Sequence, residues 1–103
     1  MKKILLACNA GMSTSMLVNK MRHAAEETGV EADIHAMSLT EATDQIDKVD
    51  VILLGPQVKF QLATVRKAAA GRIPVEVIDM RDYGTMNGKK VLQFAIDLIE
   101  KGV

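Results

Sequence analysis

Short apolar runs alternate along the chain with longer segments in which apolar residues recur at helical spacing. Three of the runs are short and largely apolar, which is typical of strands buried in a parallel sheet, and they cover residues 4–7, 49–54 and 73–78. Residues 30–36 instead alternate apolar with polar side chains. That period of two predicts a strand with one wetter face, placed at an edge of the sheet.

Four helices are predicted between and after these strands, because apolar residues recur there every three or four positions. The first spans residues 13–28 with Gly29 as its C-cap, and the second runs from Ser38, which has capping-box spacing to Glu41, to about residue 46. The last two end before Gly71 and Gly102, and their apolar stripes are Val58, Leu62, Val65 and Ala69, and Val91, Leu92, Ala95, Ile96 and Ile99.

This alternation predicts a single α/β domain over residues 1–103, in which a four-stranded parallel sheet has helices on both faces, in three layers. Because the alternating strand is second in sequence and lies at an edge, the simplest strand order is 2-1-3-4. That order reverses direction between the first and third strands, and ligands bind at the carboxyl ends of the strands that flank such a reversal. Cys8 ends the first strand and Gly55-Pro56 ends the third, so Cys8 falls at the predicted binding edge.

Composition narrows the classes of function. The 13 Lys and Arg residues are balanced by 13 Asp and Glu residues. The chain therefore has no net positive charge that would favour a nucleic acid or an anionic lipid surface as a partner. A single cysteine excludes an internal disulfide and argues against a thiolate-rich zinc site, and His23 and His35 lack metal-ligand spacing. The apolar run after Lys3 is too short for a signal peptide, and nowhere do about 18 apolar residues run together. We therefore expect a cytoplasmic domain without a metal site or a direct membrane insertion.

The segment after Cys8 is suited to binding an anion. It consists of Asn9, Ala10, Gly11, Met12, Ser13, Thr14 and Ser15. Small residues and a glycine let backbone N–H groups converge in front of the thiol, and the helix start adds unpaired N–H groups and its positive dipole end. Such a place binds a phosphate-sized dianion and favours the thiolate over the thiol, which suggests phosphoryl transfer onto sulfur. Two simpler interpretations stay open, namely Cys8 as a buried structural cysteine and Ser13 as a helix N-cap.

Other motifs for nucleophiles and phosphate binding are missing or misplaced. The chain has neither G-x-x-x-x-G-K-[ST] nor C-x-x-C, and Asp50 lies near the beginning of the third strand, whereas a receiver-like phosphoacceptor would end it. Small cysteine phosphatases clamp phosphate with the arginine of C-x5-R, and the corresponding residue here is Thr14. Losing such a transition-state donor slows the reaction by about 10²–10³, which favours a phosphoryl carrier. A low-molecular-weight-type cysteine phosphatase and a non-catalytic anion-binding module remain the alternatives.

Gly55, Pro56 and Gln57, which follow the third strand, are expected across the crevice from Cys8. Gln57 is either a ligand or partner contact or part of a plain turn before a helix. Asp79 is expected to be a turn or cap residue, since a carboxylate beside a phosphocysteine would repel the dianion. Tyr83 is a candidate for the partner-binding face. Four methionines have two alternative roles, either in loop or partner contacts or in filling the core, and they are Met12, Met16, Met80 and Met86.

Four segments resemble those of a known family, and they read "CNAGMSTSMLVNKM" from Cys8, "DVILLGPQV" from Asp50, "PVEVID" from Pro74 and "YG" at Tyr83-Gly84. With them the sequence resembles, over essentially its whole length, the enzyme IIB component, lactose/cellobiose type, of the bacterial phosphoenolpyruvate-dependent sugar phosphotransferase system. One departure is Asn9, where cellobiose-type members usually carry a small residue such as serine. Asparagine also fits an anion-binding loop.

The resemblance implies a four-stranded parallel sheet flanked by helices and a phosphotransferase activity centred on Cys8. It also implies that Cys8 receives a phosphoryl group from a histidine of a IIA protein and passes it to a sugar that the membrane-embedded IIC protein translocates. The backbone from Asn9 to Ser15 then cradles the phosphate, and no metal or organic cofactor takes part. The protein would reach the inner face of the membrane through IIC, which is expected to select the sugar.

Overall fold

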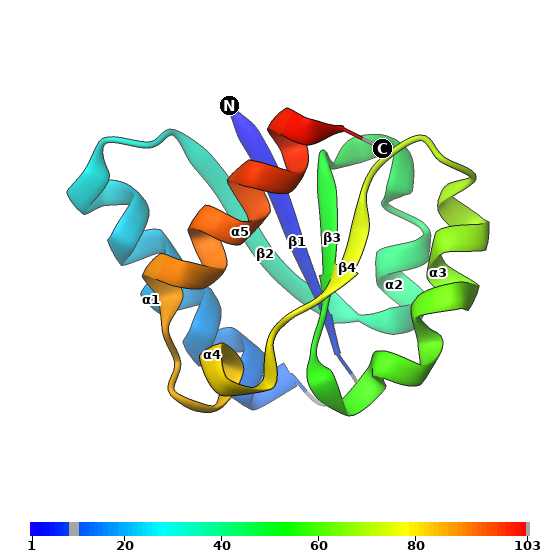
Figure 1. The fold of residues 1–103 in the computed structure, drawn as a ribbon, viewed down its shortest axis with the longest axis horizontal. Coiled ribbons are helices and arrows are strands. Elements are labelled where there is room, and N and C mark those ends of the chain that lie inside the picture. The colour runs from blue at the N-terminus through cyan, green and yellow to red at the C-terminus, as the bar shows by residue number, and fades with distance from the viewer. Residues whose placement is uncertain (9–10, 103) are drawn as a thin grey trace.

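A four-stranded parallel sheet forms the middle layer of the molecule (Figure 1). The structure is a computed structural model that describes residues 1–8 and 11–102, with the backbone alone at residues 11–13. All neighbouring strands are parallel, so the predicted α/β fold and its 2-1-3-4 strand order are confirmed. The strands are β1 (Lys2–Cys8), β2 (Ala32–Ser38), β3 (Val51–Leu54) and β4 (Val75–Val77).

Helices cover both faces of this sheet, which gives the three predicted layers. α1 (Gly11–Thr28) and α5 (Gly88–Lys101) pack together on one face (Figure 1). α2 (Leu39–Thr43) and α3 (Leu62–Ala69) pack on the other face. The remaining elements are the short helix α4 (Met80–Gly84) and two 3-10 helices, η1 (Ile46–Lys48) and η2 (Pro56–Gln61).

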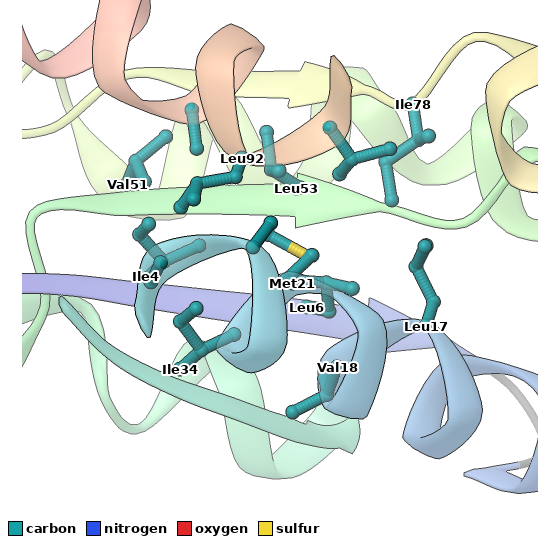
Figure 2. Packing of buried hydrophobic residues seen from close by; sticks show 14 of the residues in the cluster. Ile4, Leu6, Leu17, Val18, Met21, Ile34, Val51, Leu53, Ile78 and Leu92 are labelled. Carbon is teal, nitrogen blue, oxygen red and sulfur yellow. The ribbon is translucent and has the colours of Figure 1, made fainter. Parts of the chain in front are cut away.

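The two-sided cover explains the continuous apolar runs of the central strands. Successive side chains of a strand point to opposite faces. Ile4 and Leu6 of β1 therefore join the cluster under α1 and α5, whereas Leu5 and Ala7 join the cluster under α2 and α3. Figure 2 shows the first of these clusters, in which Met21 of α1 points in among the side chains of the sheet and α5.

Helices α1 and α5 approach each other closely at Gly88. A β-carbon added to Gly88 would lie 2.4 Å from the carbonyl carbon of Lys20 and 2.6 Å from the backbone nitrogen of Met21. Only a residue without a side chain fits there, because backbone atoms of α1 cannot move aside as a flexible side chain can. The first residue of α5 thereby fixes the position of α1 relative to its neighbour.

The first helix begins two residues earlier than predicted. Residues 11–13 are helical, so Ser13 lies inside α1 and its interpretation as the N-cap is wrong. Gly11 and Met12, which the sequence predicts as part of the loop, belong to the first turn of the helix. Nothing in this segment bars a helix before Ser13, since proline is absent from it and three adjacent hydroxyl residues offer the same capping chemistry.

Two short helices depend on side-chain caps. Ser38 caps α2 as predicted, because its Oγ accepts a hydrogen bond from the N–H of Glu41 at 3.3 Å. α4 is absent from the sequence prediction, since five residues are too few to show a helical period. Its N-cap is Asp79, whose Oδ1 accepts hydrogen bonds from the N–H groups of Arg81 at 2.8 Å and Asp82 at 3.3 Å. The cap role predicted for Asp79 is therefore confirmed.

Candidate functional site

Cys8 is the last residue of β1 and lies where the strand order of the sheet reverses. It is in register with Ser38 of β2 on one side, and on the other side Ala7 and Leu54 form the last pair between β1 and β3. Just beyond that pair, the N–H of Gly55 donates to the carbonyl oxygen of Ala7 at 2.9 Å. The predicted place of Cys8, at the carboxyl edge between β1 and β3, is confirmed.

Helix α1 begins three residues after Cys8 and brings its N-terminus to the same edge of the sheet (Figure 1). The first turn of a helix carries backbone N–H groups that lack intrahelical partners, together with the positive end of the helix dipole. The first turn of α1 contains no acidic residue that would oppose an anion. Among the predicted phosphate-binding residues, Asn9 and Ala10 lie outside the described part of the chain, and Gly11, Met12 and Ser13 supply helical backbone.

The last two residues of that segment have opposite surroundings. Ser15 is exposed to solvent. Thr14 is 0% exposed, and its Oγ1 lies 3.2 Å from the hydroxyl oxygen of Tyr83 in α4. The position that carries an arginine in small cysteine phosphatases is therefore filled here by a buried, hydrogen-bonded threonine.

Tyr83 joins three segments that are far apart in the sequence. Besides its contact with Thr14, its hydroxyl oxygen accepts a hydrogen bond from Nε2 of Gln57 at 3.1 Å. Gln57 lies in η2, which follows directly after β3. The sequence predicts Gln57 near the crevice and Tyr83 on the partner-binding face, but it holds no signal for their hydrogen bond or for the contact between Tyr83 and Thr14.

The methionines named in the sequence differ in exposure. Met16 in α1 is 57% exposed and Met80, the first residue of α4, is 66% exposed, so core filling is the wrong interpretation for these two. Met86 is partly buried against the core cluster under α1 and α5, so there the core interpretation is right. The side chain of Met12 lies outside the described part of the molecule.

Both histidines are on the surface, as predicted. Nε2 of His23 lies 3.3 Å from Oε1 of Glu27, one turn further along α1. Nε2 of His35 lies 2.7 Å from Oδ1 of Asp33 within β2. Across residues 1–8 and 11–102, no three His, Cys, Asp or Glu side chains converge in a way that could hold a metal ion. Nor does any helix in those ranges combine the length and the apolar character needed to cross a membrane.

Fold and site together define a class of protein: a small parallel α/β domain with a cysteine at the reversal point of its sheet and a helix that begins three residues later. Residues 3–94 match the family "PTS system, Lactose/Cellobiose specific IIB subunit". The chain therefore belongs to this family of the sugar phosphotransferase system, which confirms the resemblance read from its sequence. As a IIB component it belongs to a group of proteins that act as phosphotransferases.

Relatives with different named sugars are similarly close to this chain. It is 47% identical over 100 residues to the "PTS system oligo-beta-mannoside-specific EIIB component" of Bacillus subtilis (strain 168), covering 96% of this chain and 97% of that protein. It is 47% identical over 104 residues to the "PTS system galactose-specific EIIB component" of Lactococcus lactis subsp. cremoris (strain MG1363), covering 95% of this chain and 96% of that protein.

A solved structure agrees in both fold and sequence. The solution structure of a cellobiose-specific phosphotransferase IIB component from Borrelia burgdorferi superposes with a TM-score of 0.83 and is 42% identical, covering 98% of this chain and 94% of that one. Because three different sugars appear in the names of these relatives, similarity places the chain in the family without selecting its sugar.

Proposed function

We propose that this protein is a phosphoryl carrier, in which Cys8 accepts a phosphoryl group from a phosphohistidine of IIA and transfers it to a sugar taken up through IIC. One observation carries the proposal: Cys8 ends β1 at the reversal point of the sheet, and α1 begins only three residues later. Membership of the IIB family supports it, because IIB components work between IIA and IIC.

The first transfer exchanges a phosphorus–nitrogen bond for a phosphorus–sulfur bond. The Cys8 thiolate attacks phosphorus in line, and the imidazole of IIA leaves with the electron pair of the broken bond. Backbone N–H groups of the segment Asn9–Ser15 stabilise the charge on the equatorial oxygens, so the protein contributes positioning and electrostatics. Since Cys8 is only 1% exposed in the chain on its own, docking of IIA has to uncover its sulfur.

The second transfer exchanges the phosphorus–sulfur bond for a phosphorus–oxygen bond. A hydroxyl oxygen of the sugar attacks phosphorus, the hydroxyl proton passes to solvent or to a base of IIC, and Cys8 leaves as a thiolate. Thiolate is a competent leaving group, so the phosphocysteine stays reactive toward its acceptor. The reaction is that of a protein-phosphocysteine–sugar phosphotransferase and uses no metal or organic cofactor.

The surroundings of Thr14 favour a carrier over a phosphatase. A phosphatase needs a donor that clamps the transferring phosphoryl group, and loss of such a donor costs about 10²–10³ in rate. Here the corresponding side chain is buried and its hydroxyl group is held by Tyr83. A phosphoryl group on Cys8 is therefore protected from hydrolysis until the acceptor arrives. We place the protein in the cytoplasm, where IIA resides, with transient contact to the membrane through IIC.

The test is to incubate the protein with phosphoenolpyruvate, the general phosphotransferase proteins and IIA, and to measure its intact mass and phosphocysteine content. A stable adduct that is discharged only when sugar and IIC are added supports the carrier. Release of inorganic phosphate without accumulation of the adduct would support the phosphatase. If neither an adduct nor phosphate release is observed, the result supports a non-catalytic binding module. Cys8→Ser is expected to keep the fold and to form no phosphoryl adduct. Because the chain has one cysteine, loss of the adduct in this variant identifies Cys8 as the phosphorylated residue.

A further inference from the structure

One hydroxyl group connects the two segments that flank the end of β1. Tyr83 is half-buried in α4 and packs against the cluster under α1 and α5. Its hydroxyl oxygen lies 3.2 Å from Oγ1 of Thr14 and accepts a hydrogen bond from Nε2 of Gln57 at 3.1 Å. Thr14 is the fourth residue of α1, and Gln57 lies in η2 directly after β3.

Burial makes the contact between Thr14 and Tyr83 obligatory. In the described part of the chain, Thr14 is the polar side chain that is fully buried. A buried hydroxyl group that loses its partner keeps the full cost of its desolvation, so such groups are almost always hydrogen-bonded in folded proteins. Tyr83 supplies the partner, and the first turn of α1 is thereby tied to α4.

The backbone around Gly55 makes the contact with Gln57 possible. A β-carbon added to Gly55 would lie 2.5 Å from Oε1 of Gln57, so the glutamine side chain folds back over a residue that has room for it. The N–H of Gly55 also donates to the carbonyl oxygen of Ala7, the residue before Cys8. The chain of contacts therefore runs from the β1 end through η2 to Tyr83, and from there to α1.

We propose that Tyr83 is a positioning residue for phosphoryl transfer at Cys8, which fixes the first turn of α1 through Thr14 and the segment after β3 through Gln57. This inference rests on the proposed function, because it concerns the rate of that transfer. Backbone N–H groups stabilise the transferring group only when they are already in place, and misplacement by about 1 Å can cost 10²-fold in rate. Tyr83 acts through the two segments it holds, without a role as nucleophile or acid.

The experiment is a single-turnover measurement in which phosphorylated IIA is mixed with the full chain and phosphocysteine formation is followed in time. Tyr83→Phe removes the hydroxyl group and keeps the ring, and Thr14→Val keeps the shape of the threonine. Thr14→Val is expected to slow the transfer about tenfold, the rate change that corresponds to one neutral hydrogen bond. Tyr83→Phe loses the contacts with both Thr14 and Gln57 and is expected to slow it about thirtyfold. The double variant should be no slower than Tyr83→Phe alone, because the contact that Thr14→Val removes is already lost in Tyr83→Phe. Gln57→Leu, at an exposed residue, is expected to slow the transfer by about threefold.

Two comparisons separate positioning from a general loss of structure. Thr14→Ser, which keeps the hydroxyl group, should be several-fold faster than Thr14→Val at the same folded fraction. Thr28→Val removes a hydroxyl group that donates to the carbonyl oxygen of Ala24 at the far end of α1, and it should leave the rate unchanged. The final extent of Cys8 phosphorylation should be the same in all folded variants, since only the rate depends on positioning.

Each outcome decides a different claim. If the wild-type chain forms no phosphocysteine, the proposed function fails, and this inference fails with it. If the wild-type chain is phosphorylated but Tyr83→Phe, Thr14→Val and Gln57→Leu react at its rate, the proposed function stands and the role of Tyr83 is refuted. Additive effects of Tyr83→Phe and Thr14→Val would also refute it, because the two hydroxyl groups would then act separately. If Tyr83→Phe does not fold, the rates of Thr14→Val and Gln57→Leu test the positioning role. Slower transfer in these two variants supports it, and transfer at the wild-type rate refutes it.

Discussion

The hydroxyl groups of Thr14 and Tyr83 lie 3.2 Å apart, although the two residues are separated by 69 positions in the sequence. Thr14 occupies the position at which small cysteine phosphatases carry their phosphate-clamping arginine. Because Thr14 is fully buried, this position points into the protein and contacts α4. In this chain the position therefore takes part in the packing between α1 and α4.

Thr14→Arg is therefore expected to damage the fold without creating a phosphatase. A guanidinium group in place of a fully buried threonine should lower the free energy of unfolding by more than about 3 kcal/mol. Urea unfolding followed by circular dichroism measures the loss, and an aryl phosphate tests for hydrolysis. The control is Ser15→Arg at the exposed neighbouring position, where the change should stay within about 0.5 kcal/mol. A stable Thr14→Arg protein with hydrolysis that depends on Cys8 would contradict this view of the site.

Gly88→Ala is expected to separate α1 from α5. The added β-carbon would meet backbone atoms of Lys20 and Met21 at 2.4–2.6 Å, and backbone cannot rotate away as a side-chain end can. Overpacking of this kind costs about 1–3 kcal/mol, which urea unfolding resolves. Gly84→Ala is the matched control, because a β-carbon there meets nothing within 4 Å, and it should stabilise the protein by about 0.4–1 kcal/mol. Equal stability of the two variants would show that the helices move apart without cost.

The architecture was predictable because it depends on local period and composition. Residues 4–7 and 49–54 read as buried strands since both faces of β1 and β3 are covered, and the alternation at residues 30–36 identified β2 as an edge strand. Strand order then followed from the position of that edge strand, and the place of Cys8 followed from the order. The proposed partner proteins came instead from the resemblance of whole segments to a family.

Element boundaries and the contacts around Tyr83 were not predictable, for physical reasons. The hydroxyl residues at 13–15 favour a helix start at Ser13, but α1 begins at Gly11, before all three, so this preference does not locate its first residue. α3 has its C-cap at Ala70 in the left-handed conformation, with φ of 52°, although the adjacent Gly71 adopts this conformation at lower cost. The contact between Tyr83 and Thr14 forms only when α4 packs against α1, and no local pattern encodes it.

Asp79→Ala links the stability of α4 to the rate of phosphoryl transfer. Oδ1 of Asp79 accepts hydrogen bonds from the N–H groups of Arg81 and Asp82, and loss of an N-cap costs about 1 kcal/mol. Since α4 carries Tyr83, loosening its first turn should also slow the phosphorylation of Cys8 by IIA, measured in the same single-turnover assay.

Asn87→Ala is the matched control for Asp79→Ala, because Asn87 caps α5 by accepting from the N–H of Lys90 at 3.2 Å. It should cost a similar free energy of unfolding, about 1 kcal/mol, and leave the rate of transfer unchanged. Asp79→Asn retains the capping oxygen and should behave like the wild-type protein in the unfolding experiment. If Asp79→Ala and Asn87→Ala slow the transfer equally, the rate depends on overall stability, and α4 has no special part in placing Tyr83.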